Sequence, residues 1–311
     1  MAEKTIYLLP KEGNLYKANL HCHSTVSDGK FTPEQIKEMY LKRGYHAVAY
    51  TDHQVCVPHT ELTDEGFVAL TGVEIAFGIR QKSSIHVCGI SRAPDTTLTI
   101  PNELSDDVEL VNRGIKRLNE CDFITTLNHP RWSGMSASVI SQIGDVANFE
   151  VVNGFEMIQD GYGDSSACFE LELRRGRRVS PIAADDSHTM SAPEEAGYEY
   201  FRGFTVIKAE KLSYDALISA LDSNNFYAST GPMFKNLYIK DGVLHVESSP
   251  VSGVYVHGQL YSHRAALIKG EDSIECAEIN VEKILEDSSY LFVQIVDKDG
   301  KRAISAPYWI S

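Results

Sequence analysis

The first three quarters of the chain alternate short apolar runs, typical of buried strands, with segments whose apolar residues recur at helical spacing. One helix is predicted from Pro33 to Arg43, with Thr32 as its N-cap and Gly44 at its C-terminal end. A second is predicted from Ser105 to Asn119 by a single apolar stripe. Such alternation of strands and helices is typical of a mainly parallel sheet.

Four further segments complete this part of the pattern. Phe149 to Ile158 alternates as a strand does, and Ser165 to Arg175 has helical spacing. Gly134 to Gly144 is expected to form a short helix over the entrance of a site. Met1 to Lys17 is expected to be a lead-in to the first strand.

The pattern changes near Phe234. From Leu237 onward, short alternating runs are separated by turn dipeptides such as Asp241-Gly242. These runs predict a small all-β sandwich that packs on the preceding unit. We therefore expect two domains, comprising residues 1–235 and 236–311. The second is expected to serve packing or oligomer contacts or, alternatively, to gate substrate or contact a carbohydrate.

The apolar runs of the first domain repeatedly end in histidine or in a carboxylate, which packing alone does not require. The stretch from Asn19 to His23 presents His21 and His23 on one side of a predicted strand, because side chains alternate along a strand. Comparable residues follow in the next turn and at the ends of later runs: Asp28, His53, Glu74, His86, His129, Asp186 and His188. This placement is typical of a site at the carboxyl ends of barrel strands.

The chemistry of these nine side chains favours a cluster of metal ions. Six histidines and three carboxylates are too many for one ion, which takes about four to six ligands. Imidazole and carboxylate without thiolate favour Zn, Mn or Fe. We predict two or three divalent ions that share a hydroxide nucleophile, since a zinc ion alone lowers the pKa of bound water to about 7.

In this order, the residues resemble the PHP family, named for polymerase and histidinol phosphatase. The motifs are His21-x-His23, Asp28, Thr51-Asp52-His53, Gly72-Val73-Glu74, His86-Val87-Cys88-Gly89, Asn128-His129-Pro130 and Asp186-Ser187-His188. The segment from Tyr227 to Pro232 resembles the stand-alone metallohydrolase branch of that family. The resemblance implies a distorted seven-stranded (βα) barrel.

The resemblance also implies how the ligands divide within a trinuclear centre. The first ion is assigned His21, His23, Glu74 and Asp186. Glu74 is expected to bridge to a second ion, whose other ligands are His86 and His129. The third ion is assigned Asp28, His53 and His188.

Three residues outside the ligand set are candidates for catalytic roles. Asp185, beside Asp186, could orient an imidazole or move a proton. Arg131 could clamp a phosphate through two N–H groups, the alternative being a surface arginine. His59 is a candidate general acid, the alternative being a solvated histidine in a loop.

For three further residues the sequence leaves a structural role open. Trp132 could line the space for a ring-bearing substrate, or could serve packing alone. Asp52, beside His53, is expected to be structural or to orient an imidazole. Glu156 follows an apolar run but lies outside every motif, so we expect it to be structural.

Composition and charge limit the partners. The net charge of −14 disfavours a long nucleic acid or an anionic membrane, both of which require a basic surface. The six cysteines form no Cys-x-x-Cys pair, so neither a zinc ribbon nor a redox motif is indicated. No signal peptide and no apolar run of membrane-spanning length is recognisable, and we expect a cytoplasmic protein.

The sequence therefore predicts a metal-dependent hydrolase. The first hypothesis is a phosphoesterase that acts on a small phosphorylated metabolite or a short nucleotide, and a homo-oligomer is compatible with it. The alternative is an ester, amide or carbamate hydrolase with the same centre, which a dry aromatic pocket would favour over a cationic one. A non-catalytic module stabilised by metal would be expected to lack some of the nine ligands, and all nine positions are filled.

Overall fold

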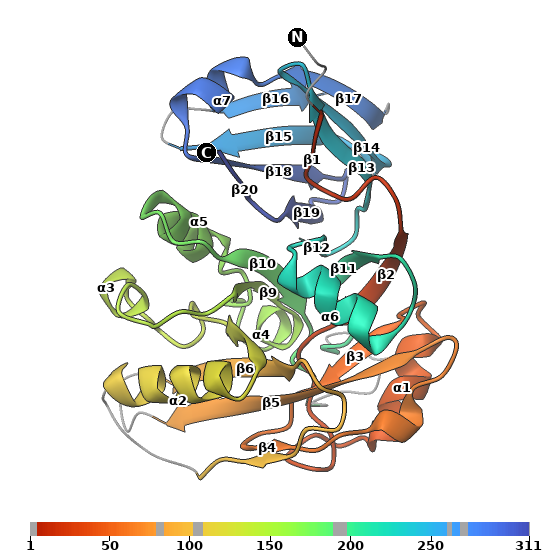
Figure 1. Cartoon of the computed structure of the whole chain (residues 1–311), viewed down its shortest axis with the longest axis vertical. Coiled ribbons are helices and arrows are strands. Elements are labelled where there is room, and N and C mark those ends of the chain that lie inside the picture. The colour runs from red at the N-terminus through yellow and green to blue at the C-terminus, as the bar shows by residue number, and fades with distance from the viewer. Residues whose placement is uncertain are drawn as a thin grey trace.

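The chain is a mixed α/β protein with one very large sheet (Figure 1). The structure is a computed structural model, which describes residues 5–78, 84–101, 108–188, 198–259, 263–267 and 273–310. None of the helices found in these residues combines the length and the apolar character that crossing a bilayer requires.

Eight strands of the large sheet build the part of the molecule that carries the predicted ligands. They are β2 (Asn14–Asn19), β3 (Ala47–Tyr50), β5 (Val68–Gly78), β6 (Ser84–Ser91), β8 (Phe123–Leu127), β9 (Asn148–Asn153), β10 (Ser180–Ala184) and β11 (Phe204–Ala209). In space their order is β10-β9-β8-β6-β5-β3-β2-β11.

The strands of this unit run in both directions. The β2, β3 and β5 strands are parallel to one another, and so are β8, β9 and β10. Between these two groups, β6 is antiparallel to both β5 and β8. The sheet is therefore mixed rather than mainly parallel, because β6 returns directly alongside β5 instead of crossing over through a helix.

The two outer strands of the run, β10 and β11, approach each other without backbone pairing. The hydroxyl of Thr205 accepts a hydrogen bond from the backbone N–H of Ala183 at 3.2 Å and donates to the carbonyl of Ala183 at 3.0 Å. The Thr205 side chain thus makes hydrogen bonds to the backbone of β10, where paired strands would bond backbone to backbone. The closed barrel of seven strands stays a prediction.

Helices flank the sheet. They are α1 (Pro33–Leu41), α2 (Val108–Glu120), α3 (Ala137–Ile140), α4 (Gly154–Gln159), α5 (Ser166–Arg174) and α6 (Tyr214–Asp222). The capping box predicted for α1 is present, since Thr32 and Gln35 bond reciprocally. The predicted start of the second helix at Ser105 lies outside the described residues. A short 3-10 turn, Thr60–Leu62, and the pair β4 (Val55–Cys56) and β7 (Leu98–Thr99) lie in connecting segments.

One predicted strand is too long. The strand expected over Phe149 to Ile158 ends at Asn153, where α4 begins. The side chain of Asn153 accepts a hydrogen bond from the backbone N–H of Glu156 at 3.0 Å and so caps the helix. Glu156 therefore lies in the first turn of a helix.

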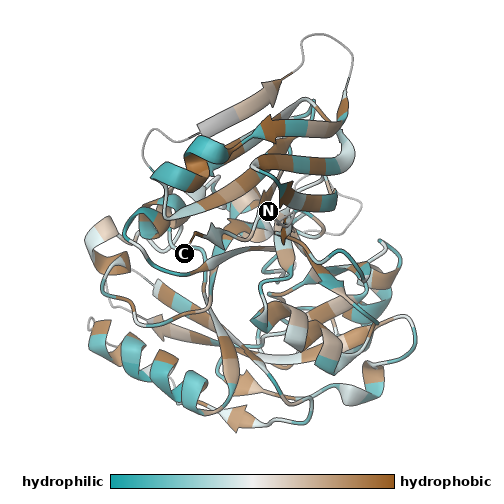
Figure 2. Cartoon of the chain, turned by 45° about the horizontal axis from the view of Figure 1, so that its top comes forward, coloured by the Kyte–Doolittle hydropathy of each residue, from teal (hydrophilic) through white to brown (hydrophobic). Residues whose placement is uncertain are grey.

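The C-terminal strands form two sheets that share one core. Beyond β12 (Phe226–Ser229), the elements are β13 (Phe234–Lys240), β14 (Val243–Val251), β15 (Gly253–Gly258), β16 (His263–Leu267), β17 (Ile274–Asn280), α7 (Glu282–Asp287), β18 (Tyr290–Val296), β19 (Arg302–Ser305) and β20 (Tyr308–Trp309). Leu237, Val246, Val254 and Val293 come from both sheets and belong to one apolar cluster, and Figure 2 shows hydrophobic bands along these strands.

This region is joined to the rest of the chain at two places. The β12 strand pairs with β19, so the large sheet continues into the C-terminal strands. The β1 strand, Thr5–Tyr7, pairs with β13 at the other end of the chain, so part of the expected lead-in is a strand of the smaller sheet. The predicted boundary at residues 235 and 236 falls inside β13, and the division into two domains stays a prediction.

Candidate metal centre

The nine predicted ligands come together in three overlapping sets. Within each set, one ligand atom from every residue lies within 4.8 Å of all the others. The sets are His21, His23, Glu74 and Asp186; Glu74, His86 and His129; and His23, Asp28, His53 and His188. This grouping matches the predicted division, except that His23 also belongs to the third set.

Neighbouring strand ends bring these residues together. His21 and His23 follow β2, while Asp186 and His188 follow β10, and an isolated bridge between Cys22 and Ser187 ties the two segments. A second isolated bridge joins His53, beyond β3, to Glu74 in β5. The side chains therefore meet because the segments that follow adjacent strands continue side by side.

Two of these residues have a left-handed backbone. The φ angle is 26° at His129 and 53° at Asp186, a region that residues other than glycine seldom adopt. At His129 the backbone N–H donates to Glu150 at 2.9 Å, and at Asp186 it donates to the carbonyl of His21 at 2.9 Å. Buried hydrogen bonds thus hold the strained conformations at the centre, where such strain is often found.

Glu74 lies between the sets. Its Oε1 is 3.1 Å from Nε2 of His21 and 3.2 Å from Nδ1 of His86. Its Oε2 is 3.2 Å from Nε2 of His23 and 3.1 Å from Nδ1 of His53. The two oxygens of one carboxylate thus face different groups of imidazoles, which is the placement required of a bridging ligand.

Several of these buried atoms have no hydrogen-bond partner among the described residues, although other polar atoms lie close by. They include Oε2 of Glu74, Nδ1 of His53 and Oδ1 of Asp186. Oε2 of Glu74 and Nδ1 of His53 are 3.1 Å apart without hydrogen-bond geometry. A buried polar atom normally has a partner, and a divalent ion between such atoms would satisfy them. The donor set therefore fits metal ions.

Burial and neighbouring charges shift the pKa values of the predicted ligands in different directions. Burial disfavours the imidazolium of His23, but Asp186 and Glu74 outweigh burial and raise its pKa to about 9. Burial lowers the pKa of His53 to about 4. Burial disfavours ionised Glu74 too, yet the surrounding histidines hold its pKa well below its usual range. The surroundings of Glu74 thus favour its carboxylate form, which attracts positive charge as a metal ligand must.

Glu150 in β9 belongs to this network and was not recognised in the sequence. Its carboxylate is completely buried and accepts hydrogen bonds from Nδ1 of His21 at 2.9 Å and from the backbone N–H of His129 at 2.9 Å. A carboxylate on the far nitrogen of an imidazole fixes the tautomer and orientation of a metal ligand. The available signal was a glutamate among the apolar residues Phe149 and Val151.

Two asparagines orient the carboxylates. Asn128 donates to Oε1 of Glu74 at 2.6 Å, and Asn153 donates to Oδ2 of Asp186 at 3.0 Å. Both asparagines are buried. Each leaves the other oxygen of its carboxylate turned toward the imidazoles.

Asp52 holds the turn that leads to Asp28. It accepts hydrogen bonds from the backbone N–H and the hydroxyl of both Ser24 and Ser27, over 2.7–3.1 Å. A Cβ on Gly29 would lie 2.3 Å from the carbonyl oxygen of His23, so only glycine fits this close turn. Asp52 therefore has the structural role that was expected.

Asp185 belongs to none of the three ligand sets. It is completely buried and accepts hydrogen bonds from the hydroxyl of Tyr40 and from the backbone N–H groups of Phe201, Arg202 and Gly203, at 2.8–3.0 Å. Burial outweighs these bonds and raises the pKa of Asp185 to about 6. Both oxygens of its carboxylate accept these hydrogen bonds. The contacts therefore support a role of Asp185 in positioning the residues around it.

The other two catalytic candidates lie outside the three sets. Arg131 is exposed, donates to the carbonyl of Asp164 at 3.4 Å and has its guanidinium 5.0 Å from the centre of the Tyr162 ring. His59 packs edge-on against Tyr50 with ring centres 4.9 Å apart. Neither contact brings these residues to the predicted ligands.

Two aromatic rings do pack against the centre. The ring of Trp132 lies 4.8 Å from that of His129 and 5.8 Å from that of His86. On another side, Phe155 lies 5.2 Å from the ring of His188. Both aromatic residues are half-buried, so they form part of the wall around the ligands.

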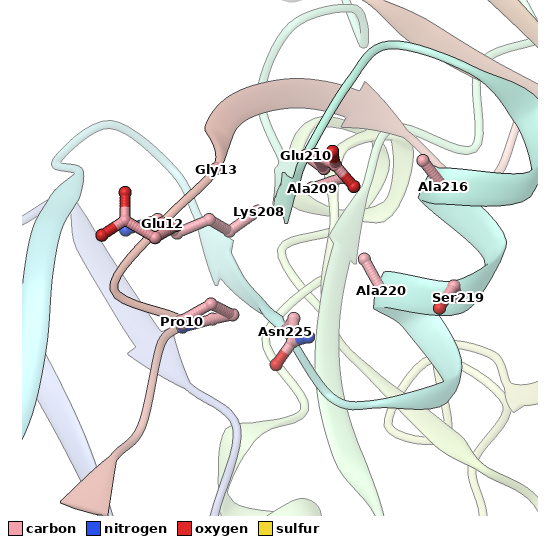
Figure 3. Close-up of a pocket in the computed structure, with 10 residues that line it drawn as sticks. All are labelled: Pro10, Glu12, Gly13, Lys208, Ala209, Glu210, Ala216, Ser219, Ala220 and Asn225. Atoms are coloured by element: carbon pink, nitrogen blue, oxygen red, sulfur yellow. The ribbon is translucent and has the colours of Figure 1, made fainter. Parts of the chain in front are cut away.

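A cavity of about 460 Å³ lies near the end of β11 and the start of β2 (Figure 3). It is lined by Glu12, Lys208 and Asn225, together with residues of α6. Because β11 ends at Ala209, which pairs with Asn14 at the start of β2, this cavity is remote from the residues that follow the end of β2. None of the nine predicted ligands lines it.

The chain is similar over its whole length to a solved structure. This is a two-domain protein from Bacteroides vulgatus that contains a predicted PHP-like metal-dependent phosphoesterase. The TM-score is 0.51 and the identity is 15%, over 100% of this chain and 99% of that one. No family model matches the chain. The PHP resemblance is thus confirmed as a likeness of fold.

Two curated relatives match short parts of the sequence. A phosphoribosyl 1,2-cyclic phosphate 1,2-diphosphodiesterase from Eggerthella lenta is 34% identical over 77 residues, which are 23% of this chain and 29% of that protein. A 5'-3' exoribonuclease from Haemophilus influenzae is 32% identical over 79 residues, 24% of this chain and 28% of that protein. The matches therefore cover less than a third of either relative.

Proposed function

We propose that the chain is a metal-dependent phosphoesterase that hydrolyses a small phosphorylated metabolite or a short nucleotide. Two or three divalent ions, Zn, Mn or Fe, would be held by the three overlapping sets. The fold it shares with a protein containing a predicted PHP-like phosphoesterase supports this proposal, as do the short matches to two enzymes that act on phosphodiesters.

The observation that carries the proposal is the position of Glu74. Its two oxygens lie 3.1–3.2 Å from the nitrogens of four histidines that come from different segments of the chain. A structural ion needs a single closed shell of ligands, usually four. A carboxylate that faces two groups of imidazoles instead fits a centre of several ions, which is the arrangement that phosphoester hydrolysis uses.

The chain's own residues would prepare this chemistry. When bound, divalent ions supply an activated water and neutralise the charge that develops on a phosphoryl group. Glu150 keeps Nε2 of His21 directed inward by accepting the proton at Nδ1. Asn128 and Asn153 hold the carboxylates of Glu74 and Asp186 in place, so that the ligand positions are organised before substrate binds.

A second candidate function is hydrolysis of an ester, amide or carbamate by the same centre. The observation that favours it is the pair of half-buried rings, Trp132 and Phe155, beside the predicted ligands. Arg131, the predicted phosphate clamp, makes its contacts with Asp164 and Tyr162 instead. An apolar wall accommodates an uncharged carbonyl substrate better than a phosphate.

Elemental analysis of the purified protein, combined with a hydrolysis screen, tests the proposal. The screen compares phosphomonoesters, phosphodiesters and carboxyl esters in the presence of Mn or Zn. We expect two or three equivalents of metal and turnover of phosphoesters that a chelator abolishes. Turnover of carboxyl esters alone would support the second candidate, and a metal-free protein would contradict both.

A further inference from the structure

Three arginines line one cavity of about 550 Å³ beside α5. They are Arg131, which follows β8, Arg174 at the end of α5, and Arg302 at the start of β19. We call this space the arginine cavity. Because Arg302 comes from the C-terminal strands, the cavity lies where these strands meet the unit that carries the predicted ligands.

Arg131 links the arginine cavity to the segment that carries one of the predicted metal ligands. The α5 helix begins just after the loop that follows β9 and α4, so its first turn lies toward the carboxyl end of β9. The backbone N–H of Arg131 donates to the hydroxyl of Ser165 at 3.3 Å, which fixes Arg131 beside the start of α5. Only Pro130 separates Arg131 from His129, so the Cα atoms of Arg131 and this predicted ligand lie within about 7 Å of each other.

The charges in this cavity favour an anion. Arg302 approaches Asp164 at 2.6 Å, and Arg174 approaches Glu170 at 3.2 Å. Arg131 contacts the carbonyl of Asp164 and the ring of Tyr162, as described above. Three guanidinium groups thus face two carboxylates, which leaves one positive charge in a chain whose net charge is −14.

The contacts also hold the guanidinium groups in place while leaving donors available. Each guanidinium has five N–H groups. Arg131 and Arg302 contact Asp164, while Arg174 contacts Glu170 and the side chain of Tyr290. The planar fork of arginine suits the oxygens of a phosphate, and it loses little freedom when the group is already anchored. Anchored arginines in a cavity are therefore a suitable site for a phosphate.

We propose that the arginine cavity binds a second phosphate group of the substrate, remote from the one that is hydrolysed. This inference rests on the proposed phosphoesterase function. It assigns the C-terminal strands a part in substrate selection through Arg302, and it names the substrate class as bisphosphorylated molecules.

The test is steady-state kinetics on a matched pair of substrates, fructose 1,6-bisphosphate and fructose 6-phosphate, with the metal-loaded full chain. The variants are Arg302→Gln and Arg174→Gln. The control is Lys116→Gln, which removes another exposed, ion-paired cation from α2. We expect KM for the bisphosphate to rise about tenfold with kcat unchanged, since a charge-assisted pair is lost. KM for the monophosphate and all constants of the control variant should stay within twofold.

Other outcomes separate this inference from the proposed function. Equal KM changes for the two sugars, or none, would overturn the role of the cavity while leaving the hydrolase intact. If wild type hydrolyses neither sugar, calorimetric titration with fructose 1,6-bisphosphate decides: binding about tenfold weaker in both arginine variants supports the cavity, and no difference overturns it. If inorganic phosphate binding weakens in the variants while the KM ratio of the sugars stays constant, the cavity binds free phosphate and the substrate assignment is wrong.

Discussion

The two parts of the chain differ in what they bury. In the strands up to β12, buried polar side chains collect at strand ends and include histidine, aspartate, glutamate and asparagine. Among the described residues from 234 to 310, the buried polar side chains are three serines, Ser248, Ser288 and Ser305. The first region thus buries clustered ionisable groups, whereas the second buries an apolar core with isolated hydroxyls.

This difference separates packing from chemistry. Burying an unpaired charge costs several kcal/mol, so clustered ionisable groups destabilise a fold unless a ligand compensates them. The histidines show the same contrast. His245 in β14 is half-buried, stacks on Tyr238 and approaches Glu278 at 3.3 Å, as a histidine on a sheet surface does. Among the described residues, only the first region therefore gathers histidines and carboxylates into sets that could hold metal ions.

The largest expected effect comes from removing one histidine in each region. We expect His23→Ala to lose bound metal and to lower turnover by about a thousandfold or more. The reason is that metal ions stabilise the charge of the transition state by several kcal/mol. Elemental analysis and kcat measurements check this. His245→Ala is the matched control and should change neither. Normal metal content in His23→Ala would contradict the ligand assignment.

The reverse experiment removes apolar volume from the C-terminal strands. Leu291 in β18 is completely buried in the core shared by the two sheets. We expect Leu291→Ala to lower the free energy of unfolding by about 2–5 kcal/mol, through lost transfer energy and a cavity. Denaturant unfolding measures this change, and metal content per folded molecule should stay at the wild-type value. A loss of metal without a loss of stability would break the comparison.

A smaller effect on metal binding is expected from changing Glu150, which contacts the predicted ligand His21. Glu150→Gln keeps the size of the side chain but removes the charge that holds His21. We expect metal affinity to fall about 10- to 100-fold, the usual effect of losing such a partner. Competition with a chelating dye measures it. An unchanged affinity would show that Glu150 serves folding alone, which an accompanying unfolding experiment would reveal.

The smallest effect concerns the pH dependence of stability. Burial, reinforced by Asp186 and Asp160, raises the pKa of Glu156 to about 9. Between the normal pKa of a glutamate and this value, the folded chain holds a proton that the unfolded chain has lost, so stability falls as pH rises. In chelator-treated protein, we expect Glu156→Gln to lose part of this decline between pH 5 and 9. Identical pH profiles of unfolding for the two proteins would contradict the assignment.

Much of the candidate site could be predicted because its residues follow apolar runs. His21, Glu74 and His129 each lie in or just beyond a strand, and the pattern of strands brings such positions together. Glu150 was missed because it lies within the short strand β9, where a pattern cannot distinguish a buried carboxylate from a solvent-facing one. Its role depends on His21, which is 129 residues away in the sequence.

The direction of strands was harder to predict than their positions. The pattern indicated parallel strands, yet β6 is antiparallel to both neighbours. Apolar runs in buried parallel and antiparallel strands look alike, so only the connection decides. Similarly, α4 begins at a side-chain cap from Asn153, a local hydrogen bond that overrides the alternating pattern expected to continue to Ile158.

The most direct test of the central claim is anomalous diffraction from crystals of the metal-loaded protein. The position of Glu74 in two of the three ligand sets predicts at least two ions about 3.5–4 Å apart, with the Glu74 carboxylate between them. His21, His23 and Asp186 should surround one ion, and His86 and His129 the other. Ions bound elsewhere, or a single ion that Glu74 does not contact, would contradict the account.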